Sequence, residues 1–241
     1  EGGDLILNQD FDGNLNGAKF TGASDIYKRG SGIIEFGALS DKFTGKMNID
    51  EGEVALRGPA TLINADNINI NAGAVLDVSN AFKISRVSRL SGAGTLALGG
   101  RDTGHIVRIN PGSNDIGVFN VTGSGALDIN GTILNMELDP TLAAGDAPGL
   151  THDQLSVQGA VSLGSTQVIK LVDRQNAASV SEFLGGREFT VVTASTGLSG
   201  FSPNSIIEDS SSFHAFVGAD PDASIITDTE IKVQFGIKTA Q

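Results

Sequence analysis

The sequence predicts an all-β protein in which short strands stack as the coils of a parallel β-helix. Three observations lead to this prediction: a high glycine content, short runs of alternating apolar and polar residues, and a glycine-led phrase that recurs. Glycine accounts for 32 of the 241 residues, nearly twice its usual share of about 7%. Tight turns favour glycine, whereas a helical bundle would lose about 1 kcal/mol for each glycine inside a helix.

The recurring phrase is a glycine, one or two further residues, and then alternating apolar positions that end at a turn. It occurs at residues 32–37, 52–58, 73–78, 94–99, 125–131 and 159–164. The leading glycines are 20, 21, 21, 31 and 34 residues apart. Three nearly equal steps followed by two longer ones indicate one structural unit that later carries insertions, as in a solenoid of stacked coils.

Within each phrase the apolar residues alternate with period two, which is typical of a strand with one buried face. Val54 and Leu56 form such a pair. Each coil is expected to contribute two or three strands, and six or seven coils would form a rod of roughly 30–40 Å. The asparagine-rich residues 64–71 are expected at corners. The best helical candidate, residues 176–183, is short and weak.

The pattern changes after residue 140, where a turn-rich segment precedes denser strands. Strands are expected at residues 154–157, 167–172, 188–194, 205–207, 214–217 and 230–237. A bare end of a stack would expose unpaired strand edges. We therefore expect residues 1–149 to form the coils and residues 150–241 to form a C-terminal β module that caps them, with a separate small β-sandwich as the alternative.

Composition and charge exclude several classes of function. The formal net charge is −12, which disfavours nucleic acid and anionic membranes as partners, because phosphates are bound by basic surfaces. The chain contains no cysteine, so disulfides, thiolate zinc sites and thiol nucleophiles are excluded. It shows no apolar run of 18 residues and no signal peptide. Since it starts at Glu1, we expect a fragment or a processed product.

Few residues suggest catalysis or metal binding. The three histidines, His105, His152 and His214, are far apart in the sequence and lack metal-ligand spacing. Ser113, His105 and Asp102 could be assembled into a triad, but no Gly-x-Ser-x-Gly elbow accompanies them.

Two short motifs are interpreted as turns. Residues 10–14 (Asp-Phe-Asp-Gly-Asn) resemble the start of a calcium loop, but Leu15 stands where that loop needs glycine and Thr21 where it needs glutamate. Residues 99–102 (Gly-Gly-Arg-Asp) are not an integrin-binding Arg-Gly-Asp sequence.

Acidic residues are scattered along the sequence, as in Asp50, Glu51 and Glu53 or Asp220 and Asp222. Polysaccharide-cleaving β-helices work instead with clustered carboxylates. The sequence therefore predicts no catalytic residue, no cofactor-binding residue and no metal ligand, and a protein that is not an enzyme.

Four stretches, taken in order, resemble the passenger region of bacterial autotransporters, the secreted part of type V secretion proteins. Residues 31–36, followed by 43–46 and 49–52, are similar to the passenger-associated repeat. Residues 90–96 (Leu-Ser-Gly-Ala-Gly-Thr-Leu) are similar to a Leu-x-Gly-x-Gly-Thr-Leu phrase that is common in that region.

The third and fourth stretches lie further along the chain. Residues 109–117 resemble the Pro-Gly-Asn-Ser-Pro-Gly phrase that precedes the last coils, although Asn114, Asp115 and Ile116 depart from it. The fourth stretch, residues 152–159 followed by 189–194, resembles elements of the autochaperone end.

The resemblance covers residues 30–200. It implies a right-handed parallel β-helix that is exported across the outer membrane, with the C-terminal module folding first as a template and a translocator β-barrel downstream in the full-length protein. It also implies a place at the cell surface or in the medium. The implied function is adhesion, the binding of a host cell-surface or matrix protein or glycan, or display as a stalk, with no cofactor. The alternatives are a polysaccharide-active β-helix enzyme (lyase or hydrolase) and a pure folding scaffold.

Overall fold

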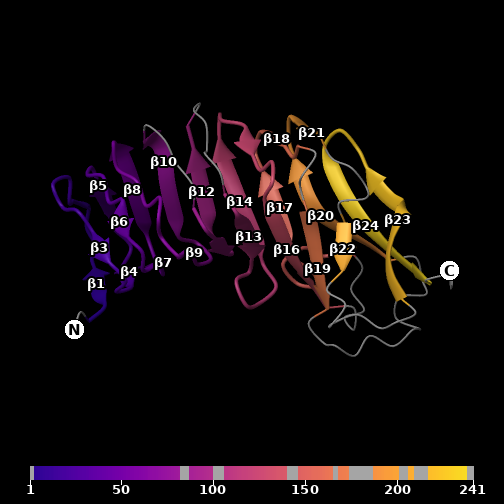
Figure 1. Cartoon of the computed structure of the whole chain (residues 1–241), viewed down its shortest axis with the longest axis horizontal. Helices are drawn as coiled ribbons and strands as arrows, with labels where there is room; N and C mark the ends of the chain where they lie inside the picture. Colours follow the sequence, from indigo (N-terminus) through magenta and orange to yellow (C-terminus); the bar gives the residue numbers. More distant parts are fainter. Residues whose placement is uncertain are drawn as a thin grey trace.

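The computed structural model describes residues 3–81, 87–99, 106–139, 146–164, 168–173, 187–200, 206–208 and 217–237, with the backbone alone for 206–208, 217–225 and 235–237. The molecule is elongated, and its strands lie side by side along the long axis, with the two termini at opposite ends (Figure 1). Every regular element in the described residues is a strand, without any helix. The predicted all-β class is therefore confirmed.

Two long sheets make up most of the molecule. The nine-stranded sheet contains, in spatial order, β1 (Leu5–Asn8), β4 (Ile26–Arg29), β7 (Lys46–Ile49), β9 (Asn67–Ile70), β11 (Leu90–Gly92), β13 (Arg108–Pro111), β16 (Ile133–Leu138), β19 (Val168–Asp173) and β22 (Ile206–Glu208). The ten-stranded sheet contains β2 (Gly13–Asn14), β5 (Ile33–Phe36), β8 (Glu53–Gly58), β10 (Val75–Ala81), β12 (Thr95–Leu98), β14 (Val118–Gly123), β17 (Gln154–Val157), β20 (Glu188–Ala194), β24 (Glu230–Ile237) and β23 (Val217–Ile226).

Short strands form a third face. One small sheet pairs β3 (Thr21–Gly22) with β6 (Lys42–Phe43), and another contains β15 (Leu127–Asp128), β18 (Ala160–Ser162) and β21 (Gly197–Ser199). Parallel single bridges between Leu39 and Thr61 and between Val87 and Ile106 lie between them in the sequence. From β1 to β22 the chain thus visits the faces in turn and pairs its strands in parallel with those of the previous turn. This arrangement is consistent with a β-helix.

The core is made of ladders of equivalent side chains. Successive strands of the nine-stranded sheet pair Ile26 with Met47, Met47 with Ile68, and so on along the stack. Members of this ladder are at most 3% exposed: Ile26, Met47, Ile68, Leu90, Ile109, Leu134 and Ile169. The ten-stranded sheet has a matching ladder, at most 4% exposed: Ile34, Val54, Leu76, Leu96, Val121, Val157 and Ala194.

The recurring phrase was assigned correctly to strands, but its last copies belong to a different face. The first four copies are β5, β8, β10 and β12, which are neighbours in the ten-stranded sheet. The next strand of that sheet is β14, so the next step of the ladder runs from Leu96 to Val121. The copies at 125–131 and 159–164 form β15 and β18 of the small third-face sheet. An alternating run specifies a strand but does not specify which face of the coil it occupies.

Lys28 interrupts the aliphatic ladder at a corner. It is fully buried and is paired in register with Leu7 on one side and Ile49 on the other. Its ammonium donates to the carbonyls of Arg29, Gly30 and Glu51 at 3.1, 2.6 and 3.1 Å. Burial lowers the pKa of Lys28, while the charges of Glu51 and Asp10 oppose that shift. All three ammonium hydrogens are thus used to hold the corner together.

Glycine is required at this corner. Gly52 has a φ of +69°, and a Cβ there would meet the carbonyl oxygens of Gly30 and Gly32 and the Lys28 ammonium. Gly30 and Gly73 stand at the corresponding corner of the coils before and after, also with positive φ.

The parallel stacking continues through residue 150. β14 pairs with β17, β16 with β19 and β17 with β20, all in parallel. Antiparallel pairing of named strands begins only at β20, which pairs with β24, and β24 pairs with β23. The division at residue 149 stays a prediction.

The helical candidate at 176–183 lies outside the described residues, and none of the described residues belongs to a helix that could span a membrane.

Candidate functional site

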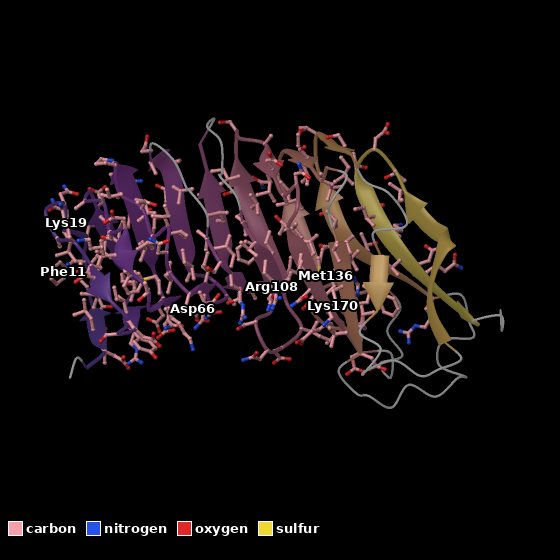
Figure 2. All side chains as sticks on the ribbon, viewed as in Figure 1. Phe11, Lys19, Asp66, Arg108, Met136 and Lys170 are labelled. Carbon is pink, nitrogen blue, oxygen red and sulfur yellow. The ribbon has the colours of Figure 1, made fainter. Side chains whose placement is uncertain are left out.

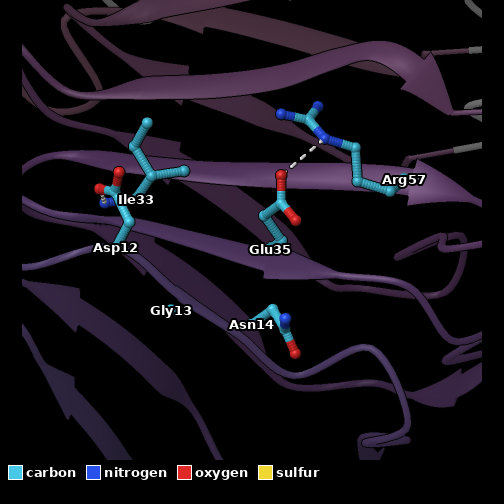
Figure 3. A pocket seen from close by; sticks show the side chains of 6 residues that line it. All are labelled: Asp12, Gly13, Asn14, Ile33, Glu35 and Arg57. Carbon is cyan, nitrogen blue, oxygen red and sulfur yellow. Dashed lines mark hydrogen bonds and ion pairs between the residues drawn. The ribbon is translucent and has the colours of Figure 1, made fainter.

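A shallow hollow opens on the outer face of the ten-stranded sheet, near the N-terminal end. Its volume is about 250 Å³. It is lined by Asp12, Gly13, Asn14, Ile33, Glu35 and Arg57 (Figure 3). We refer to it as the Arg57 hollow. Arg57 Nε donates to Glu35 Oε1 at 3.2 Å, and Arg57 Nη1 donates to Asp77 Oδ2 at 2.6 Å. The guanidinium therefore bridges two carboxylates that come from β5 and β10.

Strand register explains why these acids meet. Glu35 pairs with Ala55, and Ala55 pairs with Asp77, so all three side chains leave the same face of adjacent strands. Glu53 lies on the same strand as Ala55, two residues earlier, and therefore points to the same face. It is diagonal to both Glu35 and Asp77, at about 8 Å between Cα atoms for ordinary strand spacing. Three acids thus surround one arginine.

Environment moves the pKa values of Glu53 and Asp77 apart. Burial raises the pKa of Glu53 above its ordinary value, and the charge of Asp77 raises it further. Burial also acts to raise the pKa of Asp77, but hydrogen bonds from Ser79 and Arg57 outweigh it, and the net pKa is lowered. The acids around Arg57 thus include one carboxyl whose pKa is raised and one whose pKa is lowered, and both lie beside the hollow rather than in its lining. Such a pair is the arrangement that acid–base catalysis requires.

A metal centre is not indicated. The described residues contain no group of three or more His, Asp or Glu side chains placed to hold a metal ion. Asp12 is engaged at the backbone instead, where its Oδ1 accepts from the Ile33 amide at 3.0 Å. The turn interpretation of residues 10–14 is wrong for its last two residues, because Gly13 and Asn14 form strand β2.

A second surface, the amide row, runs along the outer face of the nine-stranded sheet. Its members occupy equivalent positions on seven successive strands: Tyr27, Asn48, Asn69, Ser91, Asn110, Asn135 and Lys170. Figure 2 shows Lys170 toward the C-terminal part of the stack. The expectation that the asparagines of residues 64–71 lie at corners holds for Asn64 and Asn71 and is wrong for Asn67 and Asn69, which lie within β9 and face outward. Ser91 is buried, at 1% exposed, and the other members are partly exposed, so the row presents polar groups at the spacing of the strands, about 4.7–4.9 Å, with one gap.

Hydrogen bonds fix the N-terminal half of this surface. Asn67 Nδ2 donates to Ser91 Oγ at 2.9 Å, and Ser91 Oγ lies 3.0 Å from Asn69 Oδ1. Asn69 Nδ2 donates to Asn71 Oδ1 at 2.7 Å, and Asn71 Nδ2 donates to Asp50 Oδ1 at 3.2 Å. Side chains held in this way lose little conformational entropy when they bind a ligand.

The histidines and the triad candidates are placed as follows. His152 is fully buried beside Phe189, so it is not part of an open site. Ser113 lies in a turn, with a φ of +69°. His105, His214 and Asp102 lie outside the described residues. Of the three residues that could be assembled into a triad, the structure therefore describes Ser113 alone.

Reasoning from sequence missed the Arg57 hollow. The expectation that acids are scattered is wrong for Glu53, which lies close to Glu35 and Asp77. It fits Asp50, which pairs with Arg29 on the other sheet, at 3.1 Å. The available signal was the spacing: Glu35, Glu53 and Asp77 are separated by about one coil, so a regular stack must bring them together.

No protein-family model matches this sequence, and no curated protein matches it. The geometry of the two surfaces is therefore what bears on function.

Proposed function

We propose that this chain is a length of right-handed parallel β-helix from the passenger region of a bacterial autotransporter. It stands at the cell surface or is secreted, and its outer faces bind a host cell-surface or matrix protein or glycan without catalysis. In the full-length protein a translocator β-barrel follows, and the C-terminal module serves as the template for folding. Where the outer faces bind nothing, the same rod acts as a display stalk.

The places of the four motif stretches support this proposal. Residues 31–36 contain β5, residues 90–96 contain β11, and residues 109–117 contain the end of β13 and the turn after it. Residues 152–159 and 189–194 contain β17 and β20, which pair with each other through Leu155 and Val192. The order of the motifs along the chain is thus also their order along the stack.

The observation that carries the binding role is the amide row. Asparagine side chains both donate and accept hydrogen bonds. A line of them at strand spacing offers repeated contacts to an extended partner, such as the hydroxyl groups of a glycan chain. A long flat surface of this kind suits adhesion better than it suits an enclosed reaction.

Binding without turnover tests the proposal. The whole chain is applied to panels of glycans and matrix proteins, together with a variant that carries Asn48→Ala, Asn69→Ala and Asn110→Ala. A matched control carries Thr95→Ala and Thr122→Ala on the outer face of the other sheet. We expect the asparagine variant to bind at least tenfold more weakly and the control to bind as the wild type does. Equal binding by both variants would show that the amide row does not bind the partner. If the wild type binds no member of the panels, the binding role is rejected and the role as a display stalk remains.

A glycan-cleaving enzyme is the second candidate, and the acids around Arg57 favour it. Glu53 with a raised pKa and Asp77 with a lowered pKa could serve as general acid and general base. Polysaccharides incubated with the chain would then yield new chain ends, and Glu53→Gln and Asp77→Asn would each abolish the release. The exposed Asp66→Asn is the control. Failure of the wild type to release product from any polysaccharide would reject this candidate.

A further inference from the structure

A buried polar cluster joins the segment 146–152, which leads into β17, to strand β20. His152 is fully buried, and its Nε2 lies 3.1 Å from the Thr190 carbonyl oxygen and 3.3 Å from Asp146 Oδ1. Its Nδ1 lies 2.9 Å from Thr151 Oγ1. Asp146 also accepts from the Thr190 amide at 2.9 Å. One imidazole thus connects a loop residue, its own neighbour in the chain, and strand β20.

The cluster sits at the junction between two kinds of pairing. β20 is parallel to β17 on one side and antiparallel to β24 on the other. His152 immediately precedes the start of β17, and Thr190 lies on β20. The next residue, Asp153, accepts from the amides of Gly117 and Glu137, both at 2.8 Å. Opening the cluster would therefore loosen the contact between the segment 146–152 and the first strand of the antiparallel unit.

Both ring nitrogens of His152 have hydrogen-bond partners, and these partners specify which nitrogen carries a hydrogen. Nε2 faces two acceptors, so it must carry a hydrogen. Thr151 Oγ1 can donate to Nδ1 when the ring is neutral, or turn its hydrogen to the Ala147 carbonyl oxygen, 3.0 Å away, when the ring is charged. A charged ring thus finds hydrogen-bond partners but remains buried. Burial lowers the pKa of His152, while the Thr190 carbonyl and Asp146 partly oppose that shift.

The surrounding charges are mostly negative. Asp146 is 36% exposed and is the one described group in ion-pair distance of the ring. Arg187 lies over the Phe189 ring, and that ring meets His152 edge-on with centroids 5.3 Å apart. The other charged groups on neighbouring elements are Asp153 before β17, Glu137 on β16, Asp139 after β16, Lys170 and Asp173 on β19, Glu188 on β20, and Lys232 opposite Thr190 on β24 with its partner Glu230.

We propose that Asp146, Thr151, His152 and Thr190 form an acid-sensitive latch, which holds the segment 146–152 on β20 at neutral pH and opens when the medium becomes mildly acidic. The open form exposes the ring to water, where its pKa is that of an ordinary histidine, 6.5. As the pH falls below that value, the open form takes up a proton first. The stability of the closed latch is therefore complete above about pH 6.5 and is lost as the pH falls through the lower pKa of the closed form.

Hydrogen exchange of single amides in the whole chain tests the latch. The Thr190 amide and the Gly149 amide, which donates to the His152 carbonyl, report opening. The Val75 amide, which donates to Gly52 in a distant coil, is the internal reference. Between pH 7.5 and 5.0, after correction for chemical exchange, we expect the opening constants of the two reporters to rise by up to tenfold per pH unit. The reference should change by less than about twofold.

Two variants separate the latch from general acid loosening. His152→Gln does not titrate, so its reporters should show no rise over the same range. Asp146→Asn removes the charge that favours the imidazolium, so its acid response should extend to lower pH. A wild-type response that His152→Gln retains would overturn the proposal, as would reporters that do not respond. If His152→Gln does not fold, an NMR titration of the wild-type imidazole decides, because a pKa at or above 6.5 contradicts the latch.

Discussion

The two ends of the stack differ in how they finish the same ladders. At the N-terminal end Leu5 is 40% exposed, whereas Ile26, its partner in register one coil later, is 3% exposed. Phe11 is 72% exposed at this end (Figure 2). At the other end β24 covers β20, and its Ile231 and Val233 are fully buried. Equivalent apolar side chains are therefore buried only where a further strand covers them, so we expect stability to be concentrated at the C-terminal end.

Truncation should give the largest difference between the two ends of the stack, measured as the ability of the remaining chain to refold. Removal of residues 150–241 takes away the antiparallel unit and the strands that pair with β14 and β16, so residues 1–149 should fail to refold from denaturant. Removal of residues 1–22 takes away only the exposed first coil, and the remainder should refold. Far-UV circular dichroism after dilution from urea measures both. Full recovery of the β signal by residues 1–149 would remove the template role of the C-terminal part.

Matched phenylalanine substitutions give the next largest difference. Phe189 is fully buried against His152, so Phe189→Ala should lower the free energy of unfolding by about 3–5 kcal/mol. Phe11→Ala removes the same side chain from the exposed end and should change it by less than about 0.5 kcal/mol. Urea denaturation of both variants measures the difference. Similar losses at the two sites would contradict the contrast between the ends.

A substitution at Lys28 tests how much the hydrogen bonds at its corner contribute to the stability of the fold. Lys28→Met keeps an unbranched side chain but removes the donors to three carbonyl oxygens. An unsatisfied buried acceptor costs about 1–3 kcal/mol, and we expect a loss of that size in thermal or urea unfolding. Lys46→Met, on the exposed side of β7, is the control and should be nearly neutral. An unchanged Lys28→Met would mean that the carbonyls find other partners.

Glu53 should give the smallest effect, and in the opposite direction. Its raised pKa means that ionisation is unfavourable in the folded chain, so wild-type stability declines as the pH rises from about 4.5 through the folded pKa. Glu53→Gln removes that cost and should stabilise the chain at pH 7 by up to about 0.5 kcal/mol, since the site is partly exposed and screened. Below pH 4 the difference should vanish. Asp66→Asn, on an exposed turn, should show neither effect.

The period-two pattern and the glycine spacing predicted many strands of the stack, although β14 and β16 were not among them. They identified β5, β8, β10 and β12 and, in the C-terminal third, β17, β20 and β24 with their bounds. They failed where two faces have the same local pattern, as for residues 125–131. Nothing in a four-residue strand such as Ile26–Arg29 distinguishes a buried lysine from an exposed one, because its partners are carbonyls from two coils.

The candidate sites were less accessible to sequence reasoning than the fold. The Arg57 hollow depends on which of many acids share a face, and this requires the register between coils. The cluster around His152 depends on contacts across 38 and 44 residues, from His152 and Asp146 to Thr190. No local motif encodes such contacts, whereas a coil repeat read with its register would have found Glu35 and Asp77 on either side of Ala55, next to Arg57 on the same face.

The most direct test of the account is the distance between equivalent positions on successive coils. The chain contains no cysteine, so pairs of spin labels can be placed on the amide row at Tyr27 with Asn110, Asn135 or Lys170. These partners lie four, five and six strands from β4, so pulsed EPR should give mean distances that rise by about 5 Å for each strand, from about 19 to about 29 Å. Distances that do not increase in this order would contradict the stacking of the coils.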